Sequence, residues 1–254
     1  MTEKYYKWTA PGGHAPVANG YRYPLPVKNG DGTWAPGEWT QPAQGDLKPR
    51  ANGYHVCREM DLTNWINDEL YECEIDGDQA ACNDPGDSIL CVRRVRLIRR
   101  IEGWNERTAR LFAVWCARQA MALIPDPDPR SVAVVDTAER FANGRATADE
   151  LAAARAAAWD VAFDEVWAAQ DADRGAAWRV SRAAWAVAGA AWAATSAAAR
   201  DAIVAARDAA WNAYWTAAWA ADRAAGRLDW VARDAARAAQ TAQFLEMIGE
   251  ERHD

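Results

Sequence analysis

Residues 205–222 read AARDAAWNAYWTAAWAAD, and this stretch decides the fold expected for the second half of the chain. It belongs to an alanine-rich tract, Leu151 to Ala225, that contains no proline and only two glycines. Two sets of regularly spaced tryptophans would each form a stripe on a helix. They are Trp178, Trp185 and Trp192, seven residues apart, and Trp211, Trp215 and Trp219, four residues apart.

Tryptophan is the side chain expected to fill the space that alanine leaves in such a helical array. Alanine buries little apolar surface, whereas one tryptophan buries roughly 150–250 Å². The chain has 15 tryptophans. We therefore expect both stripes to face protein and not a ligand, with Arg207 and Asp208 facing water. A long coiled coil that dimerises is the structural alternative.

Capping and breaking signals divide the second half into helices. Asn105 is expected to cap a first helix, and the prolines from Pro125 to Pro129 break the chain. Further signals follow along the sequence. They are a helix from Ser131 to Ala142, a stop at Asn143–Gly144, a capping box at Thr147 and Glu150, breaks near Asp171–Gly175 and Thr195–Ser196, a turn at Gly226 with Asp229 as the next cap, and an end at Gly249.

The first half has a different composition, with seven of the 11 prolines in its first fifty residues. Turns and short extended pieces are expected there. Further along we expect strands over 54–57, 71–77 and 88–101, and a helix over 61–70. The predicted fold class is α+β: a small mixed N-terminal domain of short strands plus one helix (1–103), followed by an all-α, Ala/Trp-rich antiparallel helical bundle (104–254).

Charge and composition narrow the possible partners. The net charge is −7, so strong direct nucleic-acid binding is not expected, while a partner with a basic surface would suit the chain. No signal peptide and no apolar stretch of about 18 residues is present, which indicates a cytoplasmic protein without a membrane partner. Self-association through the helices is a further possibility.

No P-loop, dinucleotide fingerprint or metalloprotease motif occurs, and no cofactor is expected. The cysteines lack the close paired spacing of zinc sites, so no metal is expected and buried thiols are the simpler interpretation. The weak catalytic candidates are His55 and Glu74. They would form an acid–base pair if strands 54–57 and 71–76 were neighbours.

Arginines cluster between Arg93 and Arg100, in the sequence RRVRLIRR. Strand alternation would expose Arg94, Arg96 and Arg100 together, where they could bind phosphates or an acidic surface beside an aromatic floor from Tyr54 or Trp65. The simpler alternative is an edge strand whose charges prevent aggregation.

Several segments carry a resemblance to known families. Residues 104–116 (WNERTARLFAVWC), 128–155 and 239–249 (AQTAQFLEMIG) resemble the Imm-5-like immunity protein family. The resemblance covers about 104–249. Before it, Leu25–Pro26, Asp31–Trp39 and Gly53–Cys57 are similar to an uncharacterised domain of actinobacterial and phage proteins. Neither resemblance implies catalytic residues, and the first implies protein binding.

The leading hypothesis is therefore a non-enzymatic protein-binding modulator of phage or actinobacterial type that neutralises a toxin or defence effector. One alternative is a phage accessory factor that acts on a DNA-transacting protein such as an integrase. The other is a nucleotide-binding or transferase enzyme centred on His55.

Overall fold

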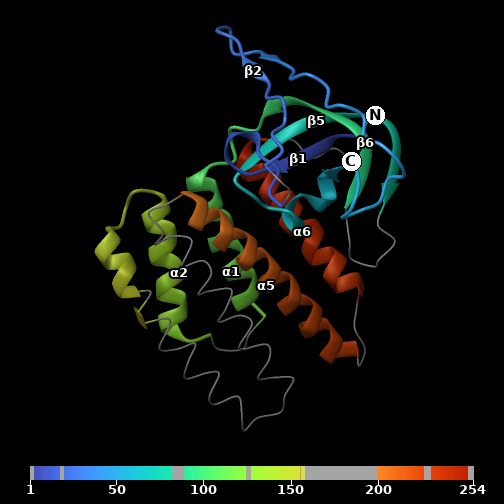
Figure 1. Cartoon of the computed structure of the whole chain (residues 1–254). Coiled ribbons are helices and arrows are strands. Elements are labelled where there is room, and N and C mark those ends of the chain that lie inside the picture. The colour runs from blue at the N-terminus through green and yellow to red at the C-terminus, as the bar shows by residue number, and fades with distance from the viewer. Residues whose placement is uncertain are drawn as a thin grey trace. The chain divides into compact units, whose positions relative to one another are not determined.

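The computed structural model describes residues 3–17, 20–81, 89–123, 127–154, 156–157, 199–225 and 230–250 (Figure 1). The chain divides into two compact units, Met1–Trp104 and Asn105–Asp254. No helix in the described part of the chain is long and apolar enough to cross a membrane.

The first unit is built on an antiparallel sheet that closes into a barrel with the strand order β1-β4-β6-β5. Closure depends on β1, which pairs with β4 on one side and β5 on the other. A short two-stranded ribbon lies outside the barrel. The elements are β1 (Tyr5–Thr9), η1 (Pro11–Gly13), β2 (Val27–Lys28), β3 (Trp34–Ala35), β4 (Tyr54–Arg58), η2 (Glu59–Asn64), β5 (Glu69–Ala81) and β6 (Leu90–Arg100).

Two irregularities shape the pairing of β5 with β6. The register shifts between Glu72 and Cys73 and again between Asp76 and Gln79. The second shift contains Gly77, whose φ of +82° favours glycine, and a Cβ there would lie 2.8 Å from the Arg93 Cβ. β-Bulges increase local twist and bend the strand, as a barrel of few strands requires.

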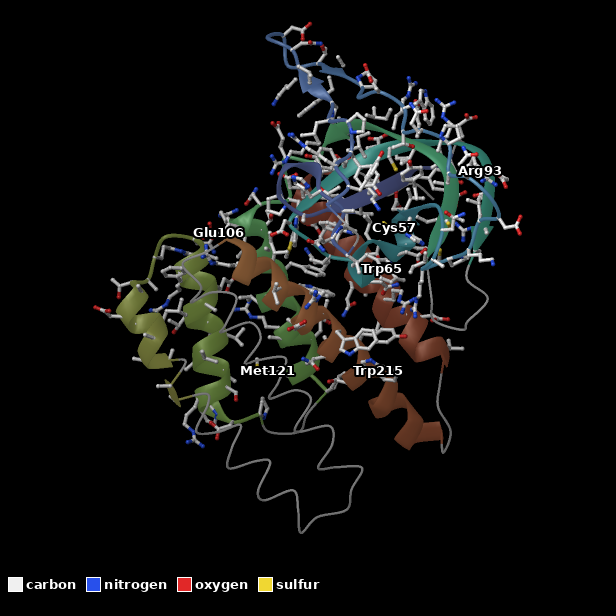
Figure 2. The ribbon with its side chains drawn as sticks, in the orientation of Figure 1. Cys57, Trp65, Arg93, Glu106, Met121 and Trp215 are labelled. Carbon is white, nitrogen blue, oxygen red and sulfur yellow. The ribbon has the colours of Figure 1, made fainter. Side chains whose placement is uncertain are left out.

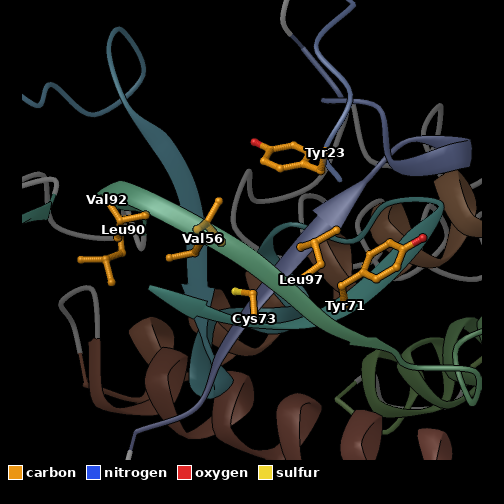
Figure 3. Close-up of a cluster of buried hydrophobic side chains, with 8 residues drawn as sticks. Tyr23, Val56, Tyr71, Cys73, Leu90, Val92 and Leu97 are labelled. Atoms are coloured by element: carbon orange, nitrogen blue, oxygen red, sulfur yellow. The ribbon is translucent and has the colours of Figure 1, made fainter. Parts of the chain in front are cut away.

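The barrel encloses a core contributed by β4, β5, β6 and the loop after η1, and the partly buried Tyr5 of β1 packs against it (Figure 3). Alternation along each strand turns one set of side chains inward. The buried cluster consists of Tyr23, Val56, Tyr71, Cys73, Leu90, Val92, Val95 and Leu97.

The described helices of the second unit are α1 (Glu106–Met121), α2 (Pro129–Ala142), α5 (Ala199–Ala225) and α6 (Trp230–Ile248). Predicted boundaries are confirmed at several of their ends. Asn105 caps α1 by accepting from the Arg107 and Thr108 N–H groups. Gly144, with φ of +67°, follows α2, and Gly249, with φ of +74°, follows α6.

The capping box after α2 is also confirmed. The Thr147 N–H donates to Glu150 Oε2 at 2.7 Å, and the Glu150 N–H donates to Thr147 Oγ1 at 3.2 Å. These two bonds satisfy two of the backbone donors that a helix start leaves unpaired.

Alanine side chains are buried along both α1 and α5. The two helices pack together, and both bury regularly spaced alanines. Of the stripe expected to face protein, Trp211 is 53% exposed, Trp215 is partly buried, and the side chain of Trp219 lies outside the described residues. The buried alanines are Ala109, Ala113, Ala117 and Ala120 on α1, and Ala202, Ala206, Ala209, Ala210 and Ala213 on α5. Small side chains allow close approach of the helix backbones, so the larger rings are not needed there.

Larger rings also contribute to the core of the second unit. Phe112 of α1 meets Phe244 of α6 edge to face, with ring centroids 5.4 Å apart, and both side chains are fully buried. Such aromatic pairs add about 0.5–1.5 kcal/mol beyond area burial.

The predicted fold class is wrong. The chain is mixed α/β, with a four-stranded antiparallel sheet and helices, and not a small domain of short strands plus one helix followed by an all-α bundle. The expected helix over 61–70 is a 3₁₀ segment, η2, followed by the start of β5. Leu62, Ile66 and Leu70 are buried, as the apolar spacing indicated. They do not lie on one helix, however, because Leu62 is in η2, Ile66 in the connection after it and Leu70 in β5.

Other sequence expectations fall on residues that the structure does not describe. These are the stripe at Trp178, Trp185 and Trp192, the breaks near 171–175 and 195–196, and the turn at 226–229.

Substitution can test whether alanine or tryptophan holds the helices together. We expect Ala113→Leu to destabilise the second unit by about 1–3 kcal/mol, because extra volume in a filled core forces helices apart. Trp211→Ala, at an exposed site, should cost clearly less. Urea unfolding followed by circular dichroism measures both. A larger loss for Trp211→Ala would contradict alanine packing.

Candidate functional site

Charged side chains form a regular ladder on the outer face of β5 and β6. Three arginines of the run between Arg93 and Arg100 lie opposite carboxylates of β5 in the strand register. The three pairs are Arg94 with Asp76 (Nη1–Oδ2 3.4 Å), Arg96 with Glu74 (Nε–Oε2 2.7 Å) and Arg99 with Glu72 (Nε–Oε2 2.7 Å). The arginine run is thus a row of cross-strand ion pairs.

An extended segment, Gly37–Ala43, runs along the other edge of β6 and is called the strap below. Backbone N–H groups of Gly37, Thr40 and Ala43 donate to the carbonyls of Leu97, Val95 and Arg93, at 2.8, 3.0 and 3.0 Å. β6 therefore has backbone partners on both sides from Arg93 to Leu97. This excludes the alternative of an exposed edge strand guarded by charge.

The strap places Trp39 against the arginine row. The Arg94 and Arg96 guanidinium carbons lie 5.1 and 4.9 Å from the centroid of its ring. Both distances are within the range of cation–π attraction. Trp39, Arg94, Arg96, Glu74 and Asp76 are called the ladder face below.

The carboxylates of the ladder face are more exposed than the guanidiniums. Asp76 and Glu74 side chains are 56% and 51% exposed, against 32% and 33% for Arg94 and Arg96. The arginines are partly covered by Trp39 and the carboxylates reach into solvent. The ladder face therefore presents a negative rim beside an aromatic ring.

Arg93 has a structural role at the second bulge and is labelled in Figure 2. Its guanidinium donates to both oxygens of Asp78, at 2.7 and 2.8 Å, and to the carbonyls of Ala43 and Gly45. The bond to Arg93 lowers the pKa of the Asp78 carboxyl. Arg93 thereby ties the strap to the barrel.

The predicted binding residues do not form one site. Arg94 and Arg96 lie together, but Arg100 pairs with Glu69 at 3.4 Å and lies opposite Tyr71 in the register. Trp65 directly follows η2 and is not part of β5, β6 or the strap. Sequence reasoning missed Trp39, because nothing in the local pattern of the strap showed which strand it would join.

Tyr54, also predicted to bind, joins a cluster of aromatic rings. Its centroid lies 5.7 Å from that of Tyr21 and 6.1 Å from that of Tyr23. Its hydroxyl donates to the Gln41 carbonyl of the strap at 2.8 Å. Tyr54 is therefore a support for the strap.

The structure does not bring His55 and Glu74 together in the sheet. In the barrel order β4 neighbours β1 and β6, so it does not pair with β5, which carries Glu74. The His55 Nε2 accepts the Arg50 backbone N–H at 2.8 Å, and His55 lies opposite Cys91. Its imidazole thus fixes the turn before β4.

The described cysteines are buried free thiols: Cys57, Cys73, Cys91 and Cys116. Burial raises the pKa of each. Within the described ranges, no group of three or more His, Cys, Asp or Glu residues could hold a metal ion. Cys82 lies outside those ranges.

A buried amine inside the barrel is a feature that the sequence did not reveal. Lys7 of β1 is 6% exposed and lies opposite Tyr71 in the register. Its ammonium donates to the His55 carbonyl and lies 4.9 Å from the centroid of the Tyr23 ring. Among the described residues, no carboxylate forms an ion pair with it. Burial lowers the pKa of Lys7 to about 8.

Comparisons with family models, with curated proteins and with solved structures found no significant match to this chain.

The buried amine predicts a specific pH dependence of stability. The unfolded chain binds the Lys7 proton more tightly than the folded chain does. Burial of the charged amine therefore lowers the free energy of unfolding by its full amount below pH 8, and this loss fades as pH rises towards 10.5. Lys7→Met should remove it, increasing the free energy of unfolding at pH 7 by up to about 3 kcal/mol. Lost bonds to His55 and Tyr23 reduce that gain.

Urea unfolding of both proteins at pH 7, 8, 9 and 10 measures the difference. The difference in free energy of unfolding between Lys7→Met and the wild type should shrink as pH rises. Lys28→Met is the control, since the Lys28 side chain is 43% exposed. A difference that is constant with pH would show that Lys7 is not penalised by burial.

Proposed function

We propose that this protein is a non-enzymatic protein-binding module whose contact surface is the ladder face. The observation that carries the proposal is the surface tryptophan, Trp39, beside Arg94 and Arg96 and next to exposed carboxylates. Tryptophan and arginine dominate the binding energy of protein interfaces, and charges at the rim set the choice of partner.

The ladder face is preorganised for binding. The guanidiniums already lie against the indole, and the strap that carries Trp39 is hydrogen-bonded to β6. A partner would therefore meet side chains that have already lost much of their conformational freedom. Less entropy is then lost on association, which favours affinity.

Charge indicates the kind of partner. The most exposed charged groups of the ladder face are the carboxylates of Asp76 and Glu74, and the whole chain carries −7. A partner with lysines or arginines around an apolar contact would complement both features.

The resemblance that we noted in the sequence of residues 104–249, which no family model matches, implies a partner that is a toxin or defence effector. Nucleases of such systems must attract phosphate and so carry basic surfaces. Alternatively, the partner is a DNA-transacting protein of a phage, such as an integrase, which would also carry a basic surface.

Affinity capture with matched variants tests the proposal. The purified chain is immobilised, incubated with extract of cells that carry its neighbouring genes, and the captured proteins are quantified. Glu74→Gln with Asp76→Asn should weaken capture of a basic protein roughly tenfold. Trp39→Ala should weaken it by about thirtyfold, the loss typical of a central tryptophan.

Two controls separate the surface from general stability. Asp136→Asn with Glu139→Gln removes the same charges from the pairs with Arg118 in the second unit. Trp34→Ala removes another ring that lies beside a cation, Lys28. Both should capture normally, and so should His55→Ala. Capture that is unchanged in the ladder-face variants, or lost in His55→Ala, would refute the proposal.

A further inference from the structure

Lys7 is connected to the strap through a short chain of contacts. Its ammonium lies over the Tyr23 ring, and the Tyr23 and Tyr54 ring centroids are 6.1 Å apart. The Tyr54 hydroxyl then donates to the Gln41 carbonyl at 2.8 Å. Gln41 is two residues from Trp39. A group inside the barrel thus reaches the ladder face through two rings and one hydrogen bond.

The attraction between Lys7 and Tyr23 depends on charge. A cation over a ring is attracted by the ring quadrupole, and the attraction is stronger where both groups are desolvated. A neutral amine lacks this attraction. Loss of the proton therefore frees the Tyr23 ring from its partner, while the ordinary packing of the two side chains remains.

Few other groups around Lys7 can change charge in the same pH range. From β4, β5 and the loop after η1, the facing titratable side chains are Cys57, Cys73, Tyr71 and Tyr23. Burial raises the pKa of all four, so they stay neutral at pH 7–9. From β6, Cys91 also has a raised pKa, and on β1 so does Tyr5.

Charged groups nearest this end of the barrel belong to another cluster. Glu69 accepts from the Tyr71 hydroxyl at 2.9 Å and from the Gly13 N–H at 3.1 Å, and it pairs with Arg100. These contacts occupy the Glu69 carboxylate away from the Lys7 amine.

We propose that the charge on the Lys7 amine controls how firmly the strap, and with it Trp39, is held against β6. The protonated amine fixes Tyr23 and, through Tyr54, the strap. The neutral amine leaves Tyr23, and through it Tyr54, less firmly held, so the strap keeps its backbone bonds to β6 but loses part of its side-chain support. The consequence for partner affinity rests on the proposed function, whereas the movement of Trp39 does not. A rise in pH through 8 therefore loosens the ladder face without unfolding the barrel.

Nuclear magnetic resonance of the free protein tests this directly. The chain is labelled with ¹⁵N at the tryptophan indoles, and the Trp39 resonance is assigned from its loss in Trp39→Phe. Between pH 7 and 9.5 the Trp39 indole signal should shift with a midpoint near 8. The shift should vanish in Lys7→Met. It should persist in Lys28→Met, which removes a different amine, one that lies over the Trp34 ring.

A second variant tests the route. Tyr54→Phe keeps the ring and removes the hydroxyl bond to Gln41. The Lys7 side-chain ¹³Cε signal should still titrate in this variant, while the Trp39 response should fall to less than half. A Trp39 signal that does not titrate in the wild type, or that titrates unchanged in Lys7→Met or Tyr54→Phe, overturns the inference. Loss of capture with an intact Trp39 titration would reject the proposed function alone.

Discussion

Closure of the barrel by one five-residue strand is the constraint on which the first unit depends. β1 (Tyr5–Thr9) has sheet partners along both edges, β4 and β5. An open four-stranded sheet would leave backbone donors exposed and would let water reach its inner face. Closure instead gives a narrow interior, and Lys7 lies in it because every second residue of a strand must face the same way.

The same register that closes the barrel creates the surface outside it. β5 and β6 place inward apolar residues such as Cys73 and Leu97 opposite one another. The residues between them then face outward, and acids on one strand meet arginines on the other. Individual exposed ion pairs add about 0–1 kcal/mol, so the ladder contributes more to the shape and charge of the surface than to stability.

Local signals were predictable from the sequence, and contacts between distant segments were not. The caps at Asn105 and at Thr147–Glu150, the strand β4 and the end of α2 follow from rules that span a few residues. The predicted helix over 61–70 was wrong because Leu62 belongs to the 3₁₀ segment η2 and Leu70 to the strand β5. Trp39 and Lys7 could not be assigned, since their positions depend on strand order.

The helical unit gives a related lesson about composition. Regular tryptophan spacing suggested that the rings join the helices, yet Trp211 is half exposed, while regularly spaced alanines are buried on α1 and α5. Periodicity identifies a stripe but not which stripe faces inward, when alanine and tryptophan are both apolar. Close backbone packing favours the smaller side chain.

The two bulges between β5 and β6 also act against misalignment of the chain. A slip of two residues in a regular antiparallel pair keeps the same side chains facing inward and can still form most of the hydrogen bonds, so it competes with the native pairing. Here a slipped β6 would have to cross two fixed irregularities, one of which admits glycine at Gly77 and little else. The bulges therefore favour one register, in which the acids, the arginines and the core residues are all correctly placed. Shifted registers become costly during folding.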